Sequence, residues 1–181
     1  VIPAVVAALP ALRQGNEREF MFPRECPRCG TAVVKPEGEV VVRCPNPACP
    51  AKGAQRVLHF ASRGAADIEG LGKKMVALLM ERGLVNDIAD LYDLSFEQLE
   101  SLPRMAELSS QNLLEALERS KQISLDRFIY ALGIRHVGER TAMLLARRCK
   151  SLDNFLKITR EDLLAVPEIG PETAEAVALF L

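Results

Sequence analysis

Tryptophan is absent from the 181-residue sequence, and only two tyrosines are present. No apolar run reaches the ~18 residues that a membrane span requires, so we expect no membrane association. An excess of charge of one sign is also missing, because 23 basic residues face 24 acidic ones. With 49% hydrophobic residues, the composition excludes a disordered chain and predicts one large or two small folded domains. The start, Val1-Ile2-Pro3, lacks both an initiator Met and a secretion signal, so we expect a piece of a longer protein.

The near-zero net charge of −1 hides an uneven distribution along the chain. Residues 52–74 and residues 130–150 are rich in Lys and Arg, whereas residues 86–118 are rich in Asp and Glu. Local charge decides where an anionic partner binds. The sequence therefore predicts two basic blocks on an acidic background.

Four of the five cysteines form two close pairs, Cys26-x2-Cys29 and Cys44-x4-Cys49. This spacing is typical of a tetrahedral zinc site, and four thiolates leave no open position for substrate, so the ion is expected to be structural. Two disulfides are the alternative, which the odd cysteine and the missing secretion signal disfavour. A redox dithiol would need a strand–helix context that is not evident. Residues 31–43 between the pairs partly alternate and contain Glu37-Gly38, which predicts a short β-hairpin.

The region after Lys52 reads as helical and contains an internal repeat with anchors at Gly72, Ala106, Gly138 and Gly170. Around each anchor, the positions four before, one before and seven after are apolar, and the position four after is small or short. Each unit is interpreted as a short helix, a tight turn and a second helix. The four copies span approximately residues 65–82, 99–117, 131–149 and 163–181.

The turn of each copy has the features of a binding site for a phosphate group. The first N–H groups of a helix have no intrahelical partner and carry the positive end of the dipole, and a glycine there allows close approach. Such binding does not depend on base sequence. We expect copies one and three, in the basic blocks, to dominate, and copies two and four to act mainly in packing. The candidate DNA-binding residues are Gly70, Gly72, Lys73, Lys74, Arg135, Val137, Gly138, Arg140, Thr141 and Gly170.

This repeat is the pattern of the helix-hairpin-helix DNA-binding motif. A helical-repeat scaffold for protein partners is the alternative, although the tetratricopeptide and ankyrin signatures are absent. A DNA-binding module of a repair nuclease or excision protein is another, but no acidic metal-binding cluster is apparent. His136 is interpreted as a surface loop residue without a catalytic role.

The combination resembles part of the bacterial NAD-dependent DNA ligases. The matching stretches include Cys26-Pro27-Arg28-Cys29-Gly30, residues 58–63 leading into Asp67-Ile68-Glu69-Gly70-Leu71-Gly72, and residues 130–138. The resemblance implies a mainly α fold with four tandem helix-hairpin-helix motifs, preceded by a small zinc finger with a short β-hairpin. It implies an OB-fold tail and linker over 1–22, the zinc finger over 23–54 and the DNA-binding domain over 55–181.

The same resemblance implies a role in sealing nicks during DNA replication and repair, with Zn²⁺ orienting the domains. The adenylation lysine of that family lies in a Lys-x-Asp-Gly motif, which this sequence lacks. NAD and Mg²⁺ are therefore expected only in missing catalytic domains, and the chain alone is expected to be inactive. The implied partners are nicked double-stranded DNA and the upstream adenylation and OB-fold domains of the same chain. We expect a monomer that acts in the bacterial cytoplasm, on the nucleoid.

Overall fold

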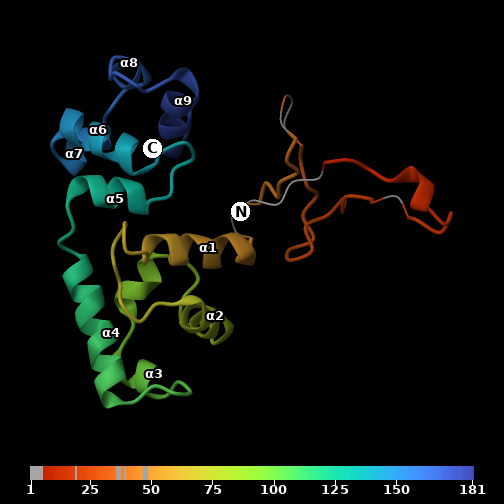
Figure 1. The fold of residues 1–181 in the computed structure, drawn as a ribbon. Coiled ribbons are helices and arrows are strands. Elements are labelled where there is room, and N and C mark those ends of the chain that lie inside the picture. The colour runs from red at the N-terminus through yellow and green to blue at the C-terminus, as the bar shows by residue number, and fades with distance from the viewer. Residues whose placement is uncertain (1–5, 19, 36–37, 39, 47–48) are drawn as a thin grey trace. The chain divides into compact units, whose positions relative to one another are not determined.

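The computed structural model describes residues 6–18, 20–35, 38, 40–46 and 49–181. It divides into two compact units, residues 1–46 and residues 47–181. Its elements are coloured along the chain in Figure 1. Within the described residues no helix is long and apolar enough to cross a membrane.

The first unit contains little regular structure. Among its described residues, a 3-10 turn, η1, spans Pro10–Leu12. Isolated antiparallel pairings join Glu25 to Ala32 and Val34 to Arg43. The second pair exchanges both backbone hydrogen bonds, at 2.7 and 2.8 Å. These are single pairs and not strands, so the expected β-hairpin is not confirmed, and its turn residue Glu37 lies outside the described residues.

The second unit is built almost entirely of short helices, which confirms the mainly helical class. Local signals explain several boundaries: proline occupies the first position of two helices, and Ser95 and Gln98 form a reciprocal capping box at another. The elements are α1 (Pro50–Phe60), α2 (Lys73–Glu81), η2 (Ala89–Asp93), α3 (Phe96–Glu100), α4 (Glu107–Ser120), α5 (Leu125–Ala131), α6 (Glu139–Cys149), α7 (Leu152–Phe155), α8 (Arg160–Leu164) and α9 (Pro171–Phe180).

The four anchors occupy the same structural position. Each is the N-cap of a helix (α2, α4, α6 or α9) in extended backbone conformation, with ψ between 170° and 179°. The anchor carbonyl accepts the N–H four residues later at 2.9–3.0 Å. Hence each anchor ends the turn and starts the second helix of its copy, as the repeat predicts.

A tight turn precedes each anchor. The carbonyl four positions before it accepts the N–H one position before it, at 3.4, 3.1, 3.0 and 3.2 Å in chain order. The residue two positions before the anchor has positive φ in all four cases, which a type II turn requires at its third residue. These left-handed residues are Gly70, Arg104, His136 and Glu168, with φ of 93°, 67°, 65° and 69°.

Side chains of the repeat form two cores. The apolar and small positions defined by the repeat are all buried except for Met105, which is half-buried. One core gathers residues of α1, α2, η2, α3 and α4 together with Ala131 of α5, and the other gathers residues of α5 to α9. Figure 1 shows the same two groups of helices, with the long helix α4 leading from one to the other.

The first copy differs from the expected helix–turn–helix unit. α1 ends at Phe60, and residues 61–67 form successive turns in place of a short helix before the bend. The carbonyls of Arg63 and Ala65 in this segment accept hydrogen bonds from Arg127, each at 2.8 Å. A side chain from more than 60 residues away therefore holds these turns, which local sequence patterns do not reveal.

Candidate metal centre and nucleic-acid interface

The four paired cysteines come together. The Sγ atoms of Cys26, Cys29, Cys44 and Cys49 all lie within 4.8 Å of one another, and those of Cys29 and Cys44 are 3.5 Å apart. Cys26 and Cys49 are buried, and the other two are half-buried. A Zn–S distance of about 2.3 Å in a tetrahedron places sulfurs about 3.8 Å apart, so this donor set fits zinc.

Backbone geometry at the first pair explains part of this gathering. The N–H of Gly30 bonds to the Cys26 carbonyl at 2.9 Å, and the N–H of Cys26 bonds to the Thr31 carbonyl at 2.8 Å. Gly30 has φ of 69°, a conformation that glycine adopts at no steric cost. The resulting knuckle turns both thiols of Cys-x-x-Cys toward one point.

The thiols differ in acidity. Hydrogen bonding to Thr31 lowers the pKa of Cys29 to about 6, whereas burial raises the pKa of Cys44 to about 11. Thiolates are the form that binds zinc, and a zinc ion supplies the charge that keeps several of them ionised together. The group therefore has the chemistry of a structural zinc site with no position left for a substrate.

The bends of copies one and three lie at the surface. Gly70, Gly72, Lys73 and Lys74 are exposed in copy one. Neither the Gly72 nor the Gly138 N-cap is capped by a side chain. A Cβ built at either anchor would meet no atom within 4 Å, so the space above these helix ends is open.

In copy three, Arg135, Gly138 and Arg140 are exposed and Thr141 is half-buried. Val137 differs from the other candidates, since its side chain is only 6% exposed and its N–H bonds to the Ile134 carbonyl at 3.0 Å. It fills the space beneath the bend and has neither group available for DNA. Val137 therefore shapes the turn, and its place among the DNA-binding residues stays a prediction.

Arg140 has an acidic partner that the sequence did not indicate. Its guanidinium lies 2.7 Å from the carboxylate of Glu168, the left-handed residue of copy four. This pairing raises the pKa of Arg140 and lowers that of Glu168. Repeat positions alone do not show that the tip of copy four lies against the helix start of copy three.

The helix starts of copies two and four offer fewer donors. In copy two, the N–H of Ala106 donates to the Ser109 hydroxyl at 2.8 Å. In copy four, Gly170 is exposed, but Pro171 at the next position has no N–H. A Glu in the first turn does not separate them from copy three, because α6 begins with Glu139 just as α4 and α9 carry Glu107 and Glu172. The smaller number of free N–H donors favours the expectation that copies one and three dominate phosphate binding and that copies two and four act mainly in packing.

Together these features define a class, a cysteine-rich zinc finger followed by helix-hairpin-helix DNA-binding regions. Family models agree, region by region. Residues 25–51 match the NAD-dependent DNA ligase C4 zinc finger domain. Residues 62–119 match a SAM-like helix-hairpin-helix tandem, and residues 127–181 match a helix-hairpin-helix motif.

Curated DNA ligases are similar to this chain along nearly all of its residues. The chain is 51% identical over 180 residues to a DNA ligase of Pelotomaculum thermopropionicum, which covers 99% of this chain and 26% of the relative. DNA ligases of Geobacter sulfurreducens and Bacillus subtilis are 49% and 46% identical over the same share of the chain, covering 27% of each. The chain thus spans about a quarter of these relatives, and it is similar to them along almost its whole length.

Proposed function

We propose that this chain is the DNA-gripping portion of an NAD-dependent DNA ligase that seals nicks in replication and repair. The observation that carries the proposal is the pair of exposed, uncapped helix starts at Gly72 and Gly138, each beside basic side chains. Main-chain N–H groups there would hold backbone phosphates without reading bases.

All four repeat units are taken as helix-hairpin-helix copies, with one and three binding phosphate and two and four packing. Gly170 would contribute less than Gly72 or Gly138, because Pro171 follows it. The common turn geometry and the matching buried positions support this assignment.

Zn²⁺ held by the four cysteines is proposed to order residues 23–54 and to orient the helical region, 55–181, relative to an OB-fold whose tail is residues 1–22. Adenylation by NAD and the Mg²⁺ chemistry would reside in other parts of such a ligase. On its own, the chain would act as a monomer, bind nicked duplex and neither adenylate nor ligate. In a bacterial cell it would work in the cytoplasm, on nucleoid DNA.

The experiment is a salt titration of binding to a nicked duplex, followed by fluorescence anisotropy. Each phosphate contact neutralised by Lys or Arg contributes a log–log slope of about −0.9. We expect the double variant K73Q/K74Q to bind the duplex more weakly. The slope of its log binding constant against log salt concentration should become shallower by the contribution of up to about two phosphate contacts.

The matched control is R82Q/K150Q, which removes the same charge at the ends of α2 and α6 opposite the bends. Equal slopes for the two double variants would contradict the assignment of the lysines. No measurable affinity of the unsubstituted chain for any duplex at low salt would contradict the function itself.

A further inference from the structure

Helix α1 is basic and lies outside every helix-hairpin-helix bend. From Pro50 to Ala66 the sequence contains no Asp or Glu, but it contains Lys52, Arg56 and Arg63. Lys52, Arg56 and His59 are spaced four and three residues apart, which places them on one face of the helix. α1 therefore presents a basic face that the four-copy repeat leaves without a role.

Contacts hold α1 against α5 and the residues that lead into the bend of copy three. Nε2 of His59 donates a hydrogen bond to the Tyr130 carbonyl at 2.8 Å, and the two rings meet edge to face with centroids 4.8 Å apart. Gly133 makes this approach feasible, because a Cβ there would lie 3.1 Å from Cδ2 of His59. The relation between α1 and copy three is thus set by specific packing within the second unit.

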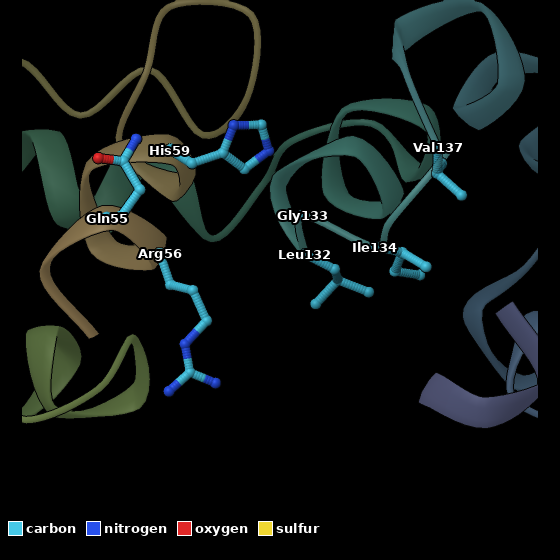
Figure 2. A pocket seen from close by; sticks show the side chains of 7 residues that line it. All are labelled: Gln55, Arg56, His59, Leu132, Gly133, Ile134 and Val137. Atoms are coloured by element: carbon cyan, nitrogen blue, oxygen red, sulfur yellow. The ribbon is translucent and has the colours of Figure 1, made fainter. Parts of the chain in front are cut away.

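A groove of about 320 Å³ lies between them. Gln55, Arg56 and His59 of α1 line the groove together with Leu132, Gly133 and Ile134, and Figure 2 shows the His59 ring extending from α1 toward the segment that carries these three. Gln55 and Arg56 are both exposed. One wall therefore carries hydrogen-bond donors and a positive charge, and the other wall is aliphatic.

These two walls match the chemistry of a sugar–phosphate backbone. A guanidinium and an amide can donate to phosphate oxygens, while aliphatic side chains contact the apolar face of deoxyribose. The groove also leads to Val137, which directly precedes the exposed start of α6. A strand bound at that helix start would have its neighbouring nucleotides near α1.

We propose that the basic face of α1, centred on Arg56, binds the DNA strand next to the nucleotide held by copy three. The inference rests on the proposed function and extends the interface from the bends to a helix outside the repeat. α1 would add charge and a second wall, so that copy three holds more than one phosphate of the same strand.

The test compares R56Q with R82Q in the zinc-loaded 181-residue chain, using salt-dependent binding to a nicked duplex. Both arginines are exposed, but Arg82 follows the C-terminal end of α2, the end opposite the bend of copy one. We expect R56Q to weaken binding by roughly 3- to 10-fold and to lower the slope by about one contact. R82Q should change the affinity and the slope by only a fraction of these amounts. Circular dichroism should show that both variants are folded.

A second measurement reports proximity directly. A photo-crosslinking amino acid at Gln55 should capture the DNA strand, and the same group at Arg82 should not. Equal effects of R56Q and R82Q, without a crosslink from position 55, would overturn this inference while leaving the proposed function intact. Failure of the unsubstituted chain to bind duplex would instead overturn the proposed function, and this inference with it.

Discussion

The position two residues before each anchor accepts very different side chains in the same backbone conformation. Glycine adopts a positive φ freely, but Arg104, His136 and Glu168 do so at a cost of about 1–2 kcal/mol each. The residue two positions before the left-handed residue is buried in every copy, the residue after it is buried or half-buried, and one backbone hydrogen bond closes the bend.

Ser110 is a polar residue at a position that is alanine in copies three and four. Its side chain is fully buried, and its hydroxyl has no hydrogen-bond partner among the residues that the structure describes. An unsatisfied buried hydroxyl costs about 1 kcal/mol or more. We expect S110A to increase the free energy of unfolding by about that amount and to raise Tm by about 3 °C, measured by thermal and urea denaturation.

Ser120 on the same helix, α4, provides the control. It is also buried, but its hydroxyl bonds to the Leu117 carbonyl at 2.6 Å and to the Tyr92 hydroxyl at 2.8 Å. S120A should therefore lower stability while S110A raises it. A loss of stability in S110A would show that its hydroxyl is satisfied in solution.

Gly138 permits a test that separates folding from binding. Its φ of −89° and the open space around it allow alanine without strain, and Ala106 already occupies the equivalent position of copy two. An added methyl group would nevertheless obstruct a phosphate approaching the N–H groups of α6. G138A should keep its stability within about 0.5 kcal/mol but lose affinity for duplex roughly 10-fold, as expected when one charge-assisted hydrogen bond is lost. Unchanged affinity would mean that this helix start does not face the DNA.

At the scale of the elements, the ion pair between Arg140 and Glu168 opposes the phosphate binding that is proposed for the bend of copy three. Both side chains are exposed, so the pair is worth at most about 1 kcal/mol and can exchange partners readily. In this arrangement a carboxylate at the tip of copy four competes with DNA for the guanidinium.

We expect E168Q to tighten duplex binding about two- to fivefold and to steepen its salt dependence, because Arg140 is then available to phosphate. E175Q is the matched control, since Glu175 pairs in the same way with Arg160, at 3.1 Å on α8 and α9. If E168Q and E175Q increase the affinity for duplex equally, the increase results from the change in overall charge and not from the release of Arg140.

The elements show which features the sequence could predict. Val76, Ala142 and Leu145 occupy apolar or small positions of the repeat, and the structure buries all three, because burial at fixed spacing is a local property. The gathering of the four cysteines followed from their spacing for the same reason. The partner of Arg140 could not be predicted, since it depends on how neighbouring copies pack. The same holds for Arg127, which shapes the turns after α1 from a distant helix.

At the scale of the whole chain, the cysteine-rich part and the helical cores are built from different residues. Every α-helix lies between Pro50 and Phe180 in the described chain, and neither core includes a zinc-site cysteine. We expect zinc removal by a chelator to leave the far-ultraviolet circular dichroism of the helices nearly unchanged and to loosen residues 23–46, as seen by limited proteolysis. Collapse of the helical signal on chelation would show that the helices depend on the metal.

The tolerance of the bends also has a consequence for how such proteins diversify. Because glycine, arginine, histidine and glutamate all occupy the same left-handed position, the charge at each tip can change by mutation while the scaffold beneath stays fixed. Affinity for DNA and the fold can then be changed separately, and protein engineering could adjust the affinity by substituting the left-handed residue of one bend at a time.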